Sequence, residues 1–273
     1  MKKSLILASA FLALVLITLL DARLDTLMAN MYQAKSLRYV PNEAFGYNEK
    51  LEYKVGYKFI TAGTGFFHIQ PNPVYKNGRE CYDVRFEVKS LKSLEMLYKV
   101  RDRYRTILDV AGIFPWEFEQ MIREGSYKRD AKAVFDQINN TATVKGQTYK
   151  TPEYVHDIVS AFFYVRTMDL SSMKNGHIFY LQNFFKDTTY TLGVKIHRRE
   201  TIEVDAGKFK CIVIEPLVSS GGLFKSEGNI YIWVTDDDRK IPVRVATRIL
   251  IGMVGADLTK YSGTRGPINA KIK

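Results

Sequence analysis

The stretch of sequence that decides the fold is GNIYIWVTDDDRKIPVRVATRI, residues 228–249. Aliphatic and aromatic side chains alternate over residues 230–234, and apolar residues again take alternate positions over residues 241–245. Three consecutive aspartates, residues 236–238, interrupt the alternation with a composition typical of a solvated turn. Two runs with a two-residue period around a short polar break predict a β-hairpin with one buried face.

The same alternation recurs along most of the chain and predicts about a dozen strands. Leu51–Lys58 and Tyr82–Val88 are two clear examples, and residues typical of turns separate the runs. A flat sheet of this size would leave long exposed edges. We therefore predict a mainly β fold built on one large antiparallel curved sheet, an open or closed β-barrel. A two-sheet sandwich is the alternative.

One segment departs from the two-residue period. Thr151-Pro152-Glu153 is typical of a helix start, with Thr151 as the cap and proline in the first turn. Apolar residues then follow at helical spacing. We predict one helix over Tyr154–Met168, packed against the sheet through Ile158, Phe162 and Val165.

The N-terminus carries the pattern of an export signal. Lys2 and Lys3 precede an apolar run at residues 5–20 that ends at Asp21. A comfortable membrane span needs about 20 residues, so this run is short for one. A cleaved signal peptide and an uncleaved inner-membrane anchor at residues 5–20 both remain open. Either one predicts a domain exported to the periplasm or associated with the outer membrane.

These patterns divide the chain of 273 residues into four parts. We predict a signal peptide or anchor at residues 1–29, a linker at 30–45, a β-rich domain at 46–262 and a basic tail at 263–273. A domain of this length is large enough to bury a substantial core.

The chain is basic, with a formal net charge of +11. Export argues against nucleic acid as the partner, so anionic lipid or polysaccharide is the more reasonable class of target. Lys99, Arg101, Arg103 and Arg105 fall on one face of a predicted strand. A solvated outer face is the simple interpretation of this row. The alternatives are a membrane-proximal surface that contacts anionic headgroups and a specific pocket for an anion.

The residues that could carry catalysis or bind metal are few and scattered. His156-Asp157 with Ser160 suggests a hydrolase, but no G-x-S-x-G motif surrounds the serine. The histidines and cysteines lack the spacing of a zinc site. We expect no enzymatic activity, no metal and no cofactor. An oxidising compartment would permit a disulfide between Cys81 and Cys211, and two separate thiols are the alternative.

Several short stretches within residues 43–260 together form a pattern that is typical of one protein family. They are Leu51-Glu52-Tyr53, Ala62-Gly63, Leu97-Tyr98-Lys99-Val100 before Asp102, Phe114-Pro115, Phe135-Asp136, Asp157 with Ser160 and Arg166, and Trp233-Val234-Thr235-Asp236-Asp237 before Ile241-Pro242-Val243. On these stretches the chain resembles the exported bacterial proteins grouped as domain of unknown function family 3108 (DUF3108). The resemblance implies a β-rich domain of the cell envelope and no catalytic residues.

Two functional hypotheses follow from these observations. In the first, a non-enzymatic envelope protein binds a lipidic or other apolar ligand in the concavity of the sheet. In the second, the protein is a structural or assembly factor that acts through envelope protein partners. Large apolar side chains on the predicted strand faces favour the first hypothesis, and a closed barrel of a dozen strands would leave room inside. The expected ligand-binding residues are Tyr53, Val55, Tyr57, Val84, Phe86 and Val88.

Overall fold

The computed structural model describes residue 23 and residues 37–57, 60–217, 230–249 and 252–272. The chain divides into two compact units, residues 1–37 and 38–273. The predicted leader at residues 5–20 lies outside the described residues, so its cleavage stays a prediction. Within the described ranges, no helix has both the length and the apolar character needed to cross a membrane.

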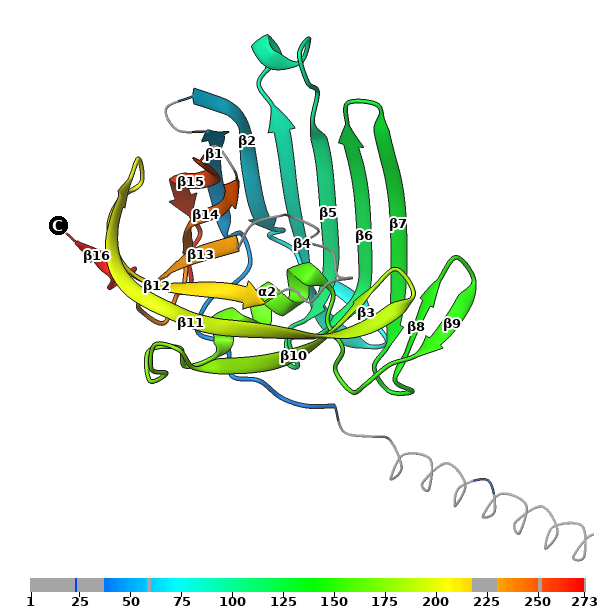
Figure 1. Cartoon of the computed structure of the whole chain (residues 1–273). Coiled ribbons are helices and arrows are strands. Elements are labelled where there is room, and N and C mark those ends of the chain that lie inside the picture. Colours follow the sequence, from blue (N-terminus) through cyan, green and yellow to red (C-terminus); the bar gives the residue numbers. More distant parts are fainter. Residues whose placement is uncertain (1–22, 24–36, 58–59, 218–229, 250–251, 273) are drawn as a thin grey trace, which may run out of the picture. The chain divides into compact units, whose positions relative to one another are not determined.

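The second unit is built on one antiparallel sheet of sixteen strands (Figure 1). Fourteen strands follow the order β10-β11-β12-β13-β14-β15-β1-β2-β4-β5-β6-β7-β8-β9, while β3 pairs with β4 and β16 with β12. Most neighbours in the sheet are also neighbours in sequence, as the alternation of short strands and turns predicts. The strands are β1 (Lys50–Tyr57), β2 (Ile60–Ile69), β3 (Val74–Lys76), β4 (Arg79–Ser90), β5 (Arg101–Asp109), β6 (Pro115–Glu124), β7 (Tyr127–Asp136), β8 (Thr141–Val144), β9 (Gln147–Lys150), β10 (Ile178–Phe185), β11 (Thr188–Val204), β12 (Gly207–Leu217), β13 (Ile230–Thr235), β14 (Pro242–Ile249), β15 (Gly252–Ser262) and β16 (Lys271–Ile272).

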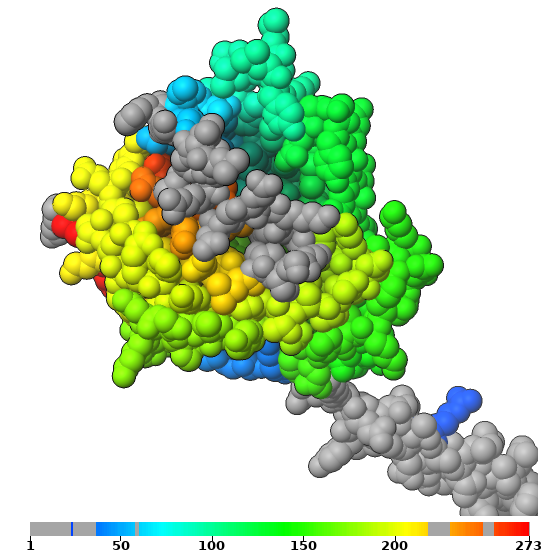
Figure 2. Space-filling model, in the orientation of Figure 1, coloured from blue at the N-terminus to red at the C-terminus, as the bar shows by residue number. Residues whose placement is uncertain are grey.

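The sheet is strongly curved and open, which confirms the predicted class of fold. Strands β4–β7 run side by side, and β10–β12 cross below them at a large angle in Figure 1. In the described ladders the edge strands β9 and β10 do not pair with each other. Side chains fill the seam instead: the ring of Phe184 on β10 lies 6.0 Å from Phe135 and 6.1 Å from Tyr149. In Figure 2, β10–β12 lie along the lower front of this unit.

Helix α2 (Ile158–Thr167) lies within the curve of the sheet and contacts β5 and β10. It begins four residues later than predicted. Tyr154 has a φ of +53°, in the left-handed region, so a right-handed helix cannot run through it. Asp157 is the N-cap, and Ser160 completes a capping box with it. These local hydrogen bonds, rather than Thr151 and its proline, set the start of the helix.

The hairpin of β13 and β14 is present, but the expectation of one buried face is wrong. Ile232 and Val234 pack on the α2 side of the sheet. Trp233 and Val243 pack on the opposite face with Phe209. The far end of β11, a strand of 17 residues, curls round to cover that face. The alternation within the hairpin cannot predict this second buried face, because the residues that cover it come from β11.

Segments expected as a linker and a loose tail are packed into the domain. Ala44 and Phe45 are buried in the core. At the other end, β16 pairs with the start of β12, and the backbone N–H of Ala270 donates to Asp237 at 2.9 Å. The β-rich unit therefore uses residues before 46 and after 262 as structural parts.

The two cysteines are free thiols, which is the second of the two alternatives that the sequence left open. Cys81 lies on β4 and Cys211 on β12, which are not neighbours in the sheet. Both are buried, and burial raises the pKa of each thiol to about 12. Thiols with so little thiolate at neutral pH are poor nucleophiles.

Two adjacent phenylalanines on α2 should respond differently to truncation. Phe163 is buried against Phe45, with ring centroids 4.8 Å apart, whereas Phe162 is half-buried. Phe163→Ala should lower the free energy of unfolding by about 3–5 kcal/mol. Phe162→Ala should cost clearly less. Urea titration of both variants checks this, and a larger loss for Phe162→Ala would contradict the observed orientation of the helix.

Candidate functional site

A cavity of about 330 Å³ lies between the concave face of the sheet and α2. Every side chain in its wall is aliphatic or aromatic. One side of the wall comes from β1, β2, β4 and β5, a second from α2, and the rest from β10–β15. The wall consists of Tyr53, Val55, Gly65, Phe67, Phe86, Val88, Tyr104, Ile158, Val159, Ala161, Phe162, Val165, Leu181, Leu192, Val194, Ile214, Pro216, Ile232, Pro242, Val245 and Ala256.

Strand register explains how these residues meet. Phe67, Phe86 and Tyr104 are paired across β2, β4 and β5, so their side chains share one face. Phe67 stacks on Phe86 at 4.3 Å and approaches Phe162 of α2 at 6.0 Å between ring centroids. These rings keep the helix and the sheet apart at this end of the cavity.

Gly65 keeps space open beside the next row of the wall. It is paired with Tyr53 on β1 and with Val88 on β4. A Cβ placed at Gly65 would lie 3.6 Å from the Cβ of Tyr53, an ordinary van der Waals contact. A larger side chain at position 65 would therefore extend into the cavity without a backbone clash.

The polar groups at the wall are the hydroxyls of Tyr53 and Tyr104, and neither is free in water. The Tyr53 hydroxyl donates to the Pro242 carbonyl at 2.8 Å, and burial raises the pKa of this tyrosine well above its usual range. Burial also raises the pKa of Tyr104. No charged side chain belongs to the described wall. A space with this lining favours apolar molecules over water.

The N-terminal end of α2 is fixed on the sheet by Asp157. Its Oδ1 accepts from the backbone N–H groups of Val159 at 2.7 Å and Ser160 at 2.9 Å. Its Oδ2 accepts from the Thr106 hydroxyl on β5 at 2.6 Å. Burial raises the pKa of Asp157, although these hydrogen bonds oppose the rise. The N-terminal turn of α2 thus sits directly on β5, below the cavity wall.

The C-terminal end of α2 is fixed by a buried ion pair. Arg166 donates to both carboxylate oxygens of Glu49, at 2.6 and 3.0 Å, and both side chains are at most 1% exposed. The same guanidinium donates to the carbonyls of Ala44 and Arg239. It also lies 5.2 Å from the rings of Phe45 and Phe163. One side chain therefore joins the helix to the N-terminal segment and to the β13–β14 turn.

Four of the six expected ligand-binding residues lie in the cavity wall. These are Tyr53 and Val55 on β1, and Phe86 and Val88 on β4. Val84 is buried instead in the core below, and Tyr57, at the end of β1, is outside the wall. Sequence reasoning missed the wall residues of β2, β5 and β10–β15, because it could not assign which strands face each other. Their ligand-binding role stays a prediction.

The predicted row of cations lies on the outer face and is paired with carboxylates. Each of the four has a carboxylate oxygen within 4.0 Å: Lys99 and Arg101 pair with Glu95, Arg103 with Glu87, and Arg105 with Asp83 and Glu119. These carboxylates come from the neighbouring strands or from the β4–β5 connection, so the row is far less positive than its sequence indicates.

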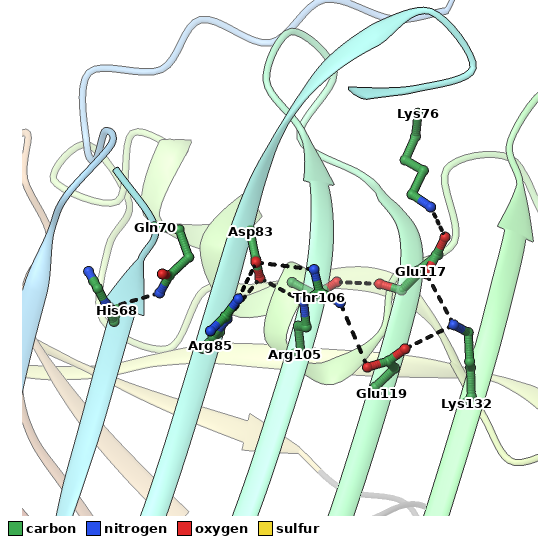
Figure 3. Close-up of polar contacts among 10 residues, drawn as sticks. All are labelled: His68, Gln70, Lys76, Asp83, Arg85, Arg105, Thr106, Glu117, Glu119 and Lys132. Carbon is green, nitrogen blue, oxygen red and sulfur yellow. Dashed lines mark hydrogen bonds and ion pairs between the residues drawn. The ribbon is translucent and has the colours of Figure 1, made fainter. Parts of the chain in front are cut away.

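The outer face of β4–β7 carries a wider network of charges (Figure 3). Arg85 and Arg105 share the buried carboxylate of Asp83 at 2.8 Å each. Lys132 bridges Glu117 and Glu119 on β6, and Lys76 also pairs with Glu117. The arginines hold the pKa of Asp83 below its usual range despite its burial. This pattern is typical of a solvated, cross-strand ion-pair surface.

His156 and Ser160 come together, but as part of the helix cap. Their Nδ1 and Oγ atoms lie 3.3 Å apart, and both residues are buried. The Ser160 hydroxyl accepts from the Asp157 N–H at 2.9 Å and donates to the Asp157 carbonyl at 3.1 Å. Burial and the nearby Arg38 lower the pKa of His156 to about 3, so it is a weak base at neutral pH. The expectation of no enzymatic activity stays a prediction.

The described residues contain no group of three or more His, Cys, Asp or Glu side chains placed to hold a metal ion. Asp237, in the aspartate run, accepts instead from Thr235 Oγ1 and from the backbone N–H groups of Arg239 and Lys240. Its carboxylate shapes the β13–β14 turn.

The fold and its cavity define an open, barrel-like β domain. The model of the family described as "Protein of unknown function (DUF3108)" matches residues 52–259, and the chain belongs to this family. No curated protein matches the sequence. A β-barrel-like protein of domain of unknown function DUF1849 from Brucella abortus has a similar fold, with a TM-score of 0.50 and 10% identity over 83% of this chain and 98% of that one. A "putative lipoprotein" from Parabacteroides distasonis is more distant, with a TM-score of 0.35 and 9% identity over 84% of this chain and 100% of that one.

Removal of one partner of the buried ion pair should be costly. Glu49→Gln leaves the Arg166 charge buried without a counter-ion, so the free energy of unfolding should fall by about 3–5 kcal/mol. Glu43→Gln is the matched control, since Glu43 pairs with Arg265 at 3.5 Å at the surface. It should change stability by less than about 1 kcal/mol. Equal losses in urea titration would show that the buried pair does not hold the fold together.

Proposed function

We propose that this protein is a non-enzymatic envelope protein that holds a lipid-like or other apolar ligand in the cavity under its curved sheet. The observation that carries the proposal is the predominantly apolar wall of the cavity, which contains no charged side chain. Ligand sites in proteins are typically concave, mostly apolar and about 300–1,000 Å³ in volume. A volume of about 330 Å³ suits an acyl chain or another narrow apolar molecule.

The shape of the site supports a preformed binding space. Asp157 and Arg166 fix α2 at both ends, so the helix cannot sink into the sheet without loss of buried hydrogen bonds. Phe67, Phe86 and Phe162 each present part of their surface to the cavity. A ligand that fills the space makes dispersion contacts with those surfaces. The binding cost is low because these rings are already in place.

The proposed location is outside the cytoplasm, in the periplasm or at the outer membrane. Its support is the N-terminal pattern of Lys2 and Lys3 before the apolar run at residues 5–20. An uncleaved leader would instead keep the domain tethered to the inner membrane. A carrier of apolar molecules has an evident use in this compartment, which separates two lipid membranes by water.

A second candidate function is assembly through a protein partner. A larger groove of about 1,190 Å³ involves the outward-facing charged side chains of β4–β7, among them Arg85, Glu87, Arg103 and Lys132. Mixed charges of this kind fit a polar protein surface better than a lipid tail. In this alternative, the apolar cavity is a consequence of the open sheet and has no ligand.

A variant that fills the cavity should separate these two functions. Gly65→Phe places a ring in the cavity, whereas Gly46→Phe is the matched control because a Cβ at Gly46 meets open space. The delipidated protein should bind dansyl-labelled undecanoic acid saturably, with increased and blue-shifted fluorescence. Gly65→Phe should weaken this binding by at least about tenfold, or about 1.4 kcal/mol, and Gly46→Phe should leave it unchanged.

The control outcomes are equally specific. Both variants should keep the circular dichroism spectrum and cooperative unfolding of the original protein. Absence of saturable binding to the original protein would remove the carrier function and favour the partner-binding one. An equal loss of binding in both variants would place the probe outside the cavity.

A further inference from the structure

The connection between β4 and β5 forms a projecting tip, defined here as residues 91–99. In Figure 1 it extends beyond the ends of the strands at the top of the molecule. Three consecutive large apolar residues occupy it: Met96 is 98% exposed, Leu97 83% and Tyr98 57%. Exposed apolar residues are common singly, but a run of three at the end of a projection indicates a contact surface.

The tip is held in shape by backbone hydrogen bonds. It contains a single 3-10 turn, η1 (Lys92–Leu94). The N–H of Leu91 donates to the Ala62 carbonyl at 2.9 Å, which fixes the start of the tip on β2. The N–H groups of Leu97 and Tyr98 both donate to the Leu94 carbonyl at 3.0 Å. The exposure of the apolar side chains is therefore built into the local backbone.

Positive charges surround these apolar residues. Residues 89–101 carry four cations and one carboxylate: Lys89, Lys92, Lys99 and Arg101 against Glu95. Glu95 is shared by Arg101 at 3.1 Å and Lys99 at 4.0 Å. The tip and its base thus keep a net positive charge after the ion pairs are counted.

A groove also connects the tip to the wall of the internal cavity. This apolar groove of about 250 Å³ runs under the tip and is lined in part by Leu94, Leu97 and Ala62. Val55 and Val88 line both this groove and the cavity. Apolar surface therefore continues from the exposed tip to the interior of the sheet.

We propose that the tip docks on the surface of an anionic lipid bilayer. Met96 and Leu97 enter the boundary between headgroups and acyl chains, Tyr98 lies at the headgroup level, and Lys92 and Lys99 contact lipid phosphates. Apolar side chains that project next to lysines and arginines are the combination that interfacial segments use. A narrow convex tip suits a deformable bilayer, whereas a protein partner would need a matching pocket and a larger contact area.

This inference does not depend on a ligand in the cavity. A protein with a permanently empty or filled cavity could still dock through the tip. Docking would, however, bring the groove under the tip, which shares Val55 and Val88 with the cavity, next to the membrane.

A fluorophore at the tip of the full-length chain tests the proposal. Met96→Cys can be labelled selectively with a nitrobenzoxadiazole reagent, because Cys81 and Cys211 are buried. The matched control is Tyr75→Cys on β3, where the native side chain is 67% exposed at the opposite end of β4. The N-terminal apolar run could also bind vesicles, so a signal that depends on label position is needed.

Vesicles of phosphatidylcholine with phosphatidylglycerol in equal parts should shift the emission of the label at position 96 to the blue. Spin-labelled lipids should quench it. Vesicles of phosphatidylcholine alone should give a several-fold smaller change, and high salt should weaken the response to anionic vesicles. The label at position 75 should not respond.

Three results would overturn the proposal. They are no change at position 96, an equal change with neutral vesicles, or an equal change at position 75. In a second variant, Lys92→Gln with Lys99→Gln should reduce the vesicle affinity of the label at position 96 by several-fold without any loss of fold. Unaltered affinity would show that these lysines do not contact lipid phosphates.

Discussion

The buried ion pair between Arg166 and Glu49 is the interaction on which the rest of the structure depends. Two buried charges are tolerated only when geometry and further hydrogen bonds compensate for lost water. Here the guanidinium binds both oxygens of Glu49 and two backbone carbonyls, Ala44 and Arg239. Those contacts join the N-terminal segment, α2 and the β13–β14 turn, which come from three distant parts of the sequence. With Asp157 at its other end, the helix is fixed inside an open sheet.

The cavity follows from this arrangement. An empty apolar space of this size costs on the order of several kcal/mol in lost contacts. If α2 were free to move, it would therefore shift toward the sheet and fill the space. The fixed ends of α2 and the rings of Phe67, Phe86 and Phe162 resist that shift. The fold thus keeps an apolar space, and a ligand that fills this space would stabilise the folded protein. The ion-pair network that includes Asp83, Arg85 and Arg105 lies on the outer face of the sheet, away from this space.

Alternation in the sequence predicted most of the strands and the inward direction of Tyr53, Val55, Phe86 and Val88. It could not separate these residues from Val84, which shares the alternation of Phe86 but is covered by the core cluster around Phe45. Other features could not be predicted for a similar reason. The acidic partners of the cationic row and the cover of the β13–β14 hairpin come from elsewhere in the chain. Glu49 lies 117 residues from Arg166, so no local pattern reveals their pairing.

The central claim is that an apolar space persists between α2 and the sheet in the folded protein. Diffraction from a crystal under pressurised xenon tests it most directly, because xenon binds in dry apolar cavities. The account predicts xenon density bounded by Phe67, Phe86 and Phe162, or density of a co-purified apolar molecule in the same place. A crystal structure with neither kind of density there, and with Phe162 turned into a filled core, would contradict the account.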